Sequence, residues 1–492
     1  MKNRKPVIER RTLTEVLSAN NMPDDTPLNG NGMIAADFSG LESKDLDFTD
    51  AKLVGVNFGS AGLAGANFTG ADLREASFKD AYLVGANFTG ALLDEVDFNN
   101  ADLEDAILDG AQMSNANYTN ANLMDTSIKG GFGSNAKFDR ACMIRANLTD
   151  STLSDSSFVG AKMKKLVAIK GNFDKSDFSN AYLSMADLSE SRLRGAKLEH
   201  VELTQATMIN TDLLGADLTH AKVTNTDLER AILASTLLIK TDFSKSNLNQ
   251  ANMSNASLTQ VNFTEASLEM AEMNGQHFSC STFKNNDFTG AKLIGADFSH
   301  VQLKDVVFVG ADLKGAKFVE ANLNGSDLSW AFCNGVDFTS ASMEKTVCNH
   351  TIMESARLVQ VDGHGILLSR CVLIGAKLID SNFSESDLQG SVFNAAYIQN
   401  VNFNKANLSG LDFSNSLIVE TCMTNTALIE TNFEKLSLSD INFSGAEMSN
   451  ANLCGTELNR CDFTNVDMKT VKKTVPTRGR NVIYGENKNL SY

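Results

Sequence analysis

A five-residue spacing of large apolar residues runs through almost the whole chain and constrains its fold more than any other feature. Counting every fifth residue from Phe38 to Met468 gives 87 positions, of which Leu fills 38, Phe 27, Met 11, and Ile, Val, Tyr or Cys another 7. The pattern fails only at Ser43, Gly133, Ala168 and Gly363. The position two residues earlier is Ala in 42 units and another small residue in 36. Because no insertion shifts this register, one architecture must account for nearly the entire sequence.

A period of five matches neither the 3.6-residue period of a helix nor the two-residue period of an ordinary strand. Each unit has two inward positions, one large and one small, which predicts a tight coil around a narrow core. All four prolines lie outside the repeat: Pro6, Pro23, Pro27 and Pro476. This exclusion is expected where every coil donates backbone hydrogen bonds to the next, because proline has no N–H to donate.

The recurring strings identify a family. Examples are Ala66-Asn67-Phe68, Ala186-Asp187-Leu188 and Ala451-Asn452-Leu453, which follow the pattern A-[DN]-[LF]-x-x. The chain thereby resembles the pentapeptide-repeat proteins. The resemblance implies an all-β fold, a right-handed quadrilateral parallel β-helix (solenoid) with four units, or 20 residues, in each coil. The chain then has about 22 coils, which would form a rod of roughly 100 Å at one strand spacing per coil.

The distribution of Phe supports a coil of 20 residues. Phe38, Phe58, Phe78 and Phe98 are spaced by 20, and Phe48, Phe68 and Phe88 fall on the opposite side of the same coils. Leu occupies the two sides between them, so every coil holds a similar core volume, as close packing requires. We expect the Phe rings to stack from coil to coil.

Three segments follow from the limits of the repeat. Residues 1–34 form an N-terminal cap segment, 35–470 a continuous β-helix, and 471–492 a basic, flexible tail. In the cap, Thr12-Leu13-Thr14-Glu15 has the sequence of a helix capping box. Leu13, Val16 and Leu17 would then cover the first coil. Where Gly133 leaves the core short of volume, we expect Phe132 to turn inward.

Composition excludes several classes of protein. The chain has 43 Lys plus Arg against 60 Asp plus Glu, a net charge of -17, which argues against a basic nucleic-acid binder. No apolar run is long enough for a membrane span, and no apolar stretch of a secretory signal follows the basic start. Eight Cys without a repeated CxxC indicate buried thiols in a reducing compartment. We expect a bacterial cytoplasmic protein, with signal-peptide-independent secretion left open.

Motifs for chemistry are absent from the sequence. There is no Gly-rich phosphate loop, no GxSxG and no HExxH. Cys348, His350, His364 and Cys371 fall on adjoining coils, but the two Cys belong to inward positions and the two His to outward ones. We therefore expect no metal site, no cofactor and no enzymatic activity, because a narrow filled core leaves no pocket.

Charge is distributed unevenly over the outward positions. Residues 35–110 hold 15 acids and 4 bases, and residues 111–170 hold 8 bases and 4 acids. The densest acidic group is Asp94, Glu95, Asp97, Asp102, Glu104, Asp105 and Asp109. The basic group is Arg140, Arg145, Lys162, Lys164 and Lys165. Each group can simply be part of a solvated surface. Alternatively, the acidic group mimics DNA, and the basic group binds an acidic partner or an anionic lipid headgroup.

An apolar ladder replaces the usual Asp or Asn in one outward position. Its members are Phe332, Ile352, Val372 and Val392, spaced by 20 and bounded by Asp312 and Asp412. A neighbouring outward position holds Trp330, His350 and Arg370, including the only Trp of the chain. Aromatic and branched side chains beside an Arg are typical of a protein-binding hot spot. These seven residues are the predicted protein-binding site.

Three functions are compatible with this sequence. The favoured one is a non-catalytic rod that serves as a protein–protein interaction scaffold. The second is an acidic DNA mimic that binds DNA gyrase or topoisomerase IV, as implied by resemblance to pentapeptide-repeat proteins that protect gyrase from quinolones. The third is a secreted bacterial effector or secretion-system accessory. The partner and the oligomeric state are not given by the sequence.

Overall fold

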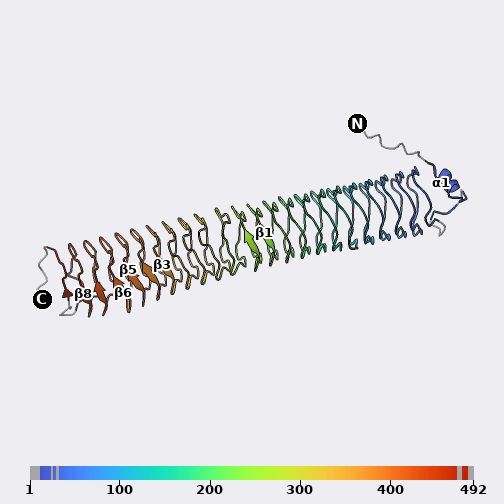
Figure 1. Ribbon diagram of the computed structural model, residues 1–492. Coiled ribbons are helices and arrows are strands. Elements are labelled where there is room, and N and C mark those ends of the chain that lie inside the picture. Colours follow the sequence, from blue (N-terminus) through green and yellow to red (C-terminus); the bar gives the residue numbers. More distant parts are fainter. Residues whose placement is uncertain (1–10, 24–25, 29–32, 474–478, 486–492) are drawn as a thin grey trace, which may run out of the picture. The chain divides into compact units, whose positions relative to one another are not determined.

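The computed structural model describes residues 11–23, 26–28, 33–473 and 479–485, which form two compact units, Met1–Asn247 and Leu248–Tyr492. In both units the chain winds as a parallel β-solenoid, in which residue i pairs with residue i + 20. The paired residues fall at four positions of each 20-residue coil, as in Lys52↔Asp72 and Asn57↔Ser77. Figure 1 shows the successive coils side by side within each unit. The predicted parallel solenoid is confirmed.

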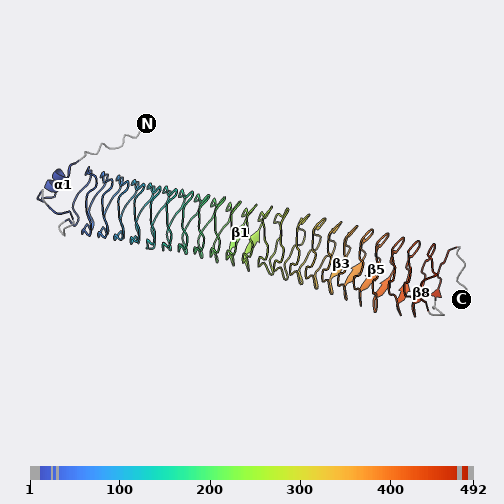
Figure 2. The same cartoon turned by 180° about the vertical axis from the view of Figure 1, so that it is seen from behind.

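Regular secondary-structure elements are short. The helix is α1 (Leu13–Ala19), and the strands are β1 (Leu237–Ile239), β2 (Ser257–Thr259), β3 (Arg357–Val359), β4 (Lys377–Ile379), β5 (Tyr397–Gln399), β6 (Leu417–Val419), β7 (Ser437–Ser439), β8 (Glu457–Asn459) and β9 (Gly479–Arg480). Strands β3 to β9 form one seven-stranded parallel sheet in the second unit. Seen from behind in Figure 2, the arrows labelled β3, β5 and β8 follow one another along this sheet.

The corners between faces are tight turns. The N–H of Ala51 donates to the carbonyl of Phe48 at 3.1 Å, and Asp50 between them has a φ of 54°. This is the geometry of a type II turn, which needs a left-handed residue at its third position. The same conformation recurs at every fifth residue through both units, where Gly, Asn and Asp alternate with bulkier residues.

The core consists of stacks of like side chains, in which Phe rings stack on Phe rings of the next coil and aliphatic side chains fill the sides between them. In the first unit Phe58 stacks on Phe78 with ring centroids 4.8 Å apart, and Phe68 stacks on Phe88 at 4.8 Å. The two rows meet edge to face, as in Phe68–Phe78 at 5.5 Å. The large and small inward positions are almost all fully buried. The expected stacking of Phe from coil to coil is confirmed.

Two irregular core positions are filled differently. At Gly133 an added Cβ would lie 2.7 Å from the backbone carbon of Met113, so the neighbouring coil itself occupies the space. The expectation that Phe132 turns inward is therefore wrong: its side chain is 47% exposed and lies in the outward pairing position. At Gly363 an added Cβ would lie 3.0 Å from the ring of Phe383, which fills the volume from the next coil.

The first coil is covered by its predicted cap. Thr12 Oγ1 accepts from the N–H of Glu15 at 3.3 Å, and Glu15 accepts from the N–H of Thr12 at 2.8 Å, which completes a capping box. Val16 and Leu17 are buried. Arg11 pairs in parallel with Leu41 and so satisfies the edge of the first coil.

The last coil is also covered, which differs from the predicted flexible tail over 471–492. Strand β9 pairs with β8 through Leu458↔Gly479 and Asn459↔Arg480, and Ile483 pairs with Asp462. Tyr484 stacks on Phe463 with centroids 5.7 Å apart. The segment 479–485 therefore supplies one more partial coil. The remainder of the predicted tail, 474–478 and 486–492, lies outside the described residues.

Candidate protein-binding face

One face of the second unit brings the predicted binding residues together. Pairing runs Asp312↔Phe332↔Ile352↔Val372↔Val392↔Asp412 without interruption. We call the four apolar rungs (Phe332, Ile352, Val372, Val392) the apolar column. Phe332 is 40% exposed, and the other three are half-buried. The structure thus places the predicted ladder on consecutive coils.

The corner that precedes this column carries the predicted aromatic group. We call Trp330, His350 and Arg370 the leading corner. The rings of Trp330 and His350 stack in parallel, with centroids 4.1 Å apart and planes 7° apart. Trp330 is nevertheless 59% exposed. On its other side the position continues with Gly310, which has no side chain to cover the second face of the indole.

The leading corner adopts left-handed backbone throughout. The φ values of Trp330, His350 and Arg370 are 63°, 61° and 57°. Gly310, Gly390 and Gly410 occupy the same position in the flanking coils. Bulky side chains are disfavoured at such φ values, and glycine is accommodated without strain. Non-Gly residues occupy the same left-handed position in other coils too, as Arg230, Gln250 and Met270 do, so the backbone accommodates the three residues of the leading corner in the usual way.

The corner that follows the apolar column was not predicted as part of the site. We call Asn334, Glu354 and Ile374 the trailing corner. Ile374 is 40% exposed, and Glu354 is exposed and accepts from Asn334 Nδ2 at 3.2 Å. Like the residues of the apolar column, Ile374 is an apolar residue at an outward position. It lies at a different position of the repeat, two residues after Val372, and was therefore not part of the predicted ladder.

The two ends of the apolar column are polar. At one end Lys314 Nζ lies 5.2 Å from the ring centroid of Phe332 and bonds Asp312 at 3.2 Å. At the other end Asp412 accepts from Ser414 and from Asn432 Nδ2, the latter at 2.9 Å. Burial would raise the pKa of Asp412, but these hydrogen bonds hold the pKa below its usual value. The apolar face is thus limited to four coils.

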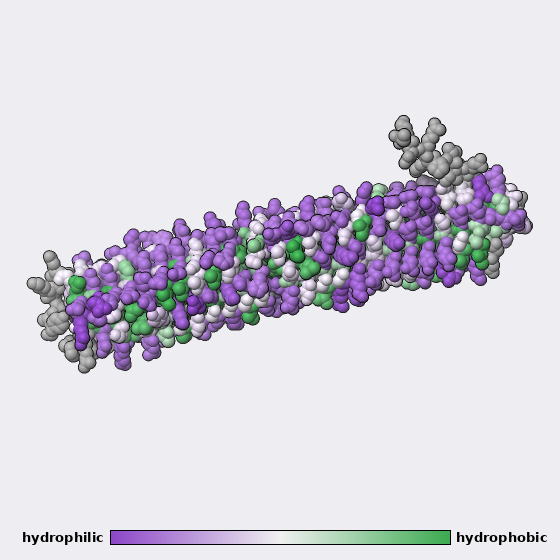
Figure 3. Space-filling model, in the orientation of Figure 1, coloured by the Kyte–Doolittle hydropathy of each residue, from purple (hydrophilic) through white to green (hydrophobic). Residues whose placement is uncertain are grey.

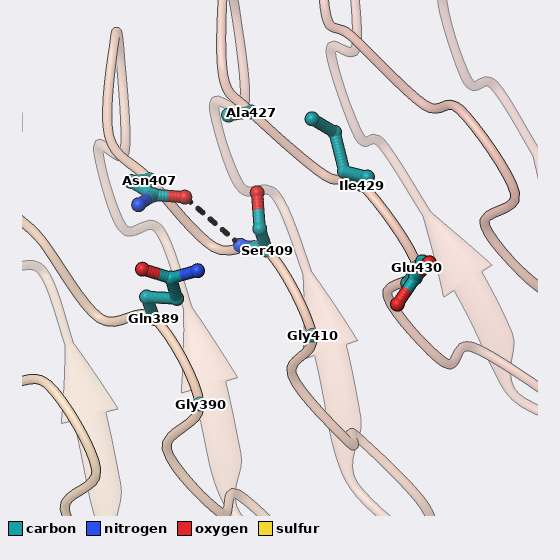
Figure 4. Close-up of a pocket in the computed structure, with 8 residues that line it drawn as sticks. All are labelled: Gln389, Gly390, Asn407, Ser409, Gly410, Ala427, Ile429 and Glu430. Atoms are coloured by element: carbon teal, nitrogen blue, oxygen red, sulfur yellow. Dashed lines mark hydrogen bonds between the residues drawn. The ribbon is translucent and has the colours of Figure 1, made fainter.

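A shallow groove lies beside the end of the leading corner. It encloses about 590 Å³ and is lined by Gln389, Gly390, Asn407, Ser409, Gly410, Ala427, Ile429 and Glu430. Figure 4 labels Gly390 and Gly410 among the lining residues and shows the hydrogen bond from Ser409 N to Asn407 Oδ1, which measures 3.2 Å. Its only ionisable lining side chain is Glu430. The groove therefore offers no acid–base pair for catalysis.

The predicted acidic group does not gather on one side. Its seven members lie within less than one coil, so they are distributed around the circumference. Five of them are half-buried and accept hydrogen bonds that hold adjacent turns, as Asp97 does from Asn117 Nδ2 at 2.8 Å. The five are Asp94, Asp97, Asp102, Glu104 and Asp109. Glu95 and Asp105 are exposed.

The predicted basic group does lie on one face of the first unit. All five side chains are exposed, and they occupy two successive coils: Arg140, Arg145, Lys162, Lys164 and Lys165. Arg145 pairs with Asp125, with Nη2 and Oδ2 2.5 Å apart, and the hydrogen bond lowers the pKa of that carboxyl. Part of this positive charge is therefore neutralised within the coil stack.

Three Cys side chains, Cys333, Cys348 and Cys371, are buried in the core. Cys371 Sγ donates to the carbonyl of Cys348 at 2.7 Å, and burial raises the pKa of Cys371 to about 12. Burial also raises the pKa of Cys333 and Cys348. Among the residues that the structure describes, no three His, Cys, Asp or Glu side chains are grouped so that they could hold a metal ion. Nor does any described helix have the length and apolarity to cross a membrane.

The comparisons with known proteins agree with the architecture. The family model "Pentapeptide repeats (8 copies)" matches overlapping segments that together cover 44–120, 134–234, 241–360, 366–434 and 437–472. The chain belongs to the pentapeptide-repeat family. A search of curated proteins found no match.

Solved structures of the same family are similar to parts of this chain. HetL, a pentapeptide-repeat protein involved in heterocyst differentiation regulation in the cyanobacterium Nostoc sp. strain PCC 7120, is 23% identical over 47% of this chain and 88% of its own, with a TM-score of 0.18. A pentapeptide-repeat protein of the Arabidopsis thaliana thylakoid lumen is 27% identical over 24% and 69%, with a TM-score of 0.17. Full-length QnrB1, a plasmid-mediated fluoroquinolone resistance protein, is 16% identical over 42% and 92%, with a TM-score of 0.15.

Proposed function

We propose that this pentapeptide-repeat protein is a non-catalytic scaffold that binds protein through the apolar face. The observation that carries the proposal is the apolar column. In the coils that flank the column this outward position holds Asp312, Asp412 and Asn432, and the side-chain oxygen of Asp412 accepts from the turn and from the next coil. Four consecutive coils give up those hydrogen bonds for apolar surface, which is favourable only if that surface is covered.

The leading corner supports the same conclusion. Trp330 combines a large exposed ring with fixed orientation, because it is stacked on His350. Aromatic residues and Arg provide most of the free energy of association at interfaces. The hydrophilic side chains that predominate in the space-filling view of Figure 3, among scattered hydrophobic ones, are the ordinary outward residues of such a solenoid.

The test is partner capture with a matched variant. Trp330→Gly combined with Phe332→Asn introduces residues that the chain already uses at the same positions, Gly310 and Asn432. Phe132→Asn removes the other exposed Phe as a control. We expect the double variant to lose the proteins, including untagged copies of the chain, that wild type and the control retain. Equal capture by all three, with unchanged circular dichroism, would contradict the proposal.

A second candidate is binding to DNA gyrase or topoisomerase IV as an acidic mimic of duplex DNA. The net charge of -17 favours it, and residues 35–110 alone contribute -11. It predicts that purified protein alters gyrase supercoiling and that the Trp330/Phe332 variant acts as strongly as wild type. No effect on supercoiling at micromolar protein would exclude this candidate.

A further inference from the structure

The two corners that flank the apolar column carry complementary side chains. The leading corner presents His350 and Arg370, and within these coils the trailing corner presents one ionisable group, the exposed carboxylate of Glu354. Each corner lies two residues from the apolar column, on opposite sides of it. The same face therefore carries a carboxylate, Glu354, and a guanidinium, Arg370, that do not pair with each other. Within the chain Glu354 accepts from Asn334 instead.

We infer that the partner of the apolar face is a second copy of this chain, packed in parallel about a twofold axis that runs along the apolar column. This inference rests on the proposed function and names the partner at the same face. Such an axis places the apolar column of one copy against that of the other. It also brings each leading corner against the trailing corner of the second copy.

The pairs produced by this axis are favourable at successive coils. His350 faces Glu354 of the second copy and can donate a hydrogen bond to it. Arg370 faces Ile374 of the second copy, and Glu354 of that copy lies one coil away, roughly 4.8 Å along the stack and within reach of a guanidinium. Each pair occurs twice, because the interface is isologous.

Shape agrees with charge. Trp330, the most prominent side chain of the leading corner, faces the short side chain of Asn334 in the second copy, beside Gly335. On the neighbouring coils the leading position is Gly310 and Gly390. These glycines leave the projecting residues of the leading corner flanked by flat surface. The second copy can therefore approach closely enough to cover Phe332 and Ile352.

The antiparallel alternative is disfavoured by the same residues. An axis perpendicular to the stack at the middle of the apolar column, between the coils of Ile352 and Val372, would place Glu354 against Ile374 of the second copy. It would also place His350 against Arg370, so Glu354 would gain no basic partner. Only the parallel arrangement brings Glu354 opposite the leading corner, where His350 and Arg370 lie.

Sedimentation over a concentration series gives the first test, with the full chain. Wild type should form a dimer, and Glu354→Arg or Arg370→Glu should weaken it at least tenfold. The combined Glu354→Arg/Arg370→Glu variant should recover affinity to within a few-fold of wild type. Glu344→Arg, an exchange of the same type in a different outward position, should have no effect. A monomeric wild type, or failure of the combined variant to recover, would overturn the inference.

Cysteine cross-linking distinguishes the two orientations. With a parallel axis, Ile352→Cys, Val372→Cys and Val392→Cys should each form an intermolecular disulfide above the background of wild type. With an antiparallel axis between the coils of Ile352 and Val372 none of the three would cross-link to itself, whereas a mixture of the Ile352→Cys and Val372→Cys chains would form a mixed disulfide, which would refute the parallel arrangement. Ser342→Cys, in another pairing position, is the control. If wild type is monomeric yet captures a different protein that the Trp330/Phe332 variant loses, the inference fails and the proposed function stands.

Discussion

Phe132 and Phe332 are the two Phe residues outside the core positions, and both lie in the same outward pairing position of their units. Their exposures are similar, 47% and 40%. Phe132 pairs with Gln112 and Thr152, whereas Phe332 is followed by Ile352 and two further apolar rungs. Exposure of a single ring is therefore not enough to indicate a protein-binding site. The proposed site at Phe332 is indicated by an apolar surface that continues over successive coils.

The backbone beneath the two rings differs as well. Gly133 follows Phe132 and lets the neighbouring coil approach, whereas Cys333 follows Phe332 and is a fully buried core residue. Phe132 thus lies over an irregular part of the core, and Phe332 lies over a regular one.

The largest expected effect is on the free energy of unfolding, when Leu replaces the glycine at one of the two irregular core positions, Gly133 or Gly363. Gly133→Leu restores the repeat but places a Cβ against the backbone of Met113, so we expect a loss of about 3 kcal/mol in unfolding free energy. Gly363→Leu meets the ring of Phe383 at 3.0 Å and, less closely, the carbonyl of Asn382 at 3.3 Å, so adding Phe383→Leu should restore most of the stability. Thermal unfolding of the three variants measures this. A fully stable Gly133→Leu would show that the coils at Met113 can separate at little cost.

The next effect concerns association. Phe332→Asn should weaken dimerisation by about 30-fold, because an aromatic hot-spot residue of an interface contributes about 2 kcal/mol. Phe132→Asn should leave the dissociation constant unchanged. Sedimentation equilibrium compares the two directly. Equal effects would remove the distinction between the isolated and the continuous apolar surface.

A smaller effect is expected inside the first unit, in the ring stack of Phe98, Tyr118 and Phe138. The hydroxyl of Tyr118 is buried between Phe98 and Phe138 and has no hydrogen-bond partner, and burial raises the pKa of Tyr118. Tyr118→Phe should stabilise the protein by about 1 kcal/mol, since it removes an unsatisfied polar group. The melting temperature should rise. A fall would mean that the hydroxyl is hydrogen-bonded in solution.

The smallest effect depends on pH and on the polar boundary of the apolar column. The pKa of Asp412 is lowered in the folded state, so its contribution to stability is present at neutral pH and is lost as the pH falls through the folded pKa. Asp412→Asn should therefore be less stable than wild type at pH 7, with a difference that shrinks below pH ~4. Melting curves at several pH values test this. A constant difference would assign the effect to packing alone.

Sequence periodicity predicted the fold well, because a register without insertions assigns every residue to an inward or outward position. The ring stacks and the apolar ladder followed directly from it. Other features depend on side-chain direction, which a period does not give. Phe132 was expected in the core but points outward, and Phe383 reaches back to fill the space at Gly363.

The candidate site was predicted in part for the same reason. Counting by 20 found Phe332 and Trp330 but not the contact from Lys314 to Phe332 or the role of Ile374. Likewise, composition showed an acidic region but not that carboxylates such as Asp97 are engaged in hydrogen bonds between coils. Which charges remain available to a partner depends on these bonds.

The pairing of residue i with residue i + 20 also has a genetic consequence. Loss or duplication of twenty codons within the repeat removes or adds one whole coil, and every later residue stays on its own side. Loss of a single five-residue unit between Phe332 and Ile352 would instead carry Ile352, Val372 and Val392 to the adjacent side, away from Phe332. The apolar face can therefore lengthen or shorten only in whole coils, so the number of units between its rungs, as well as side-chain identity, determines whether the face exists.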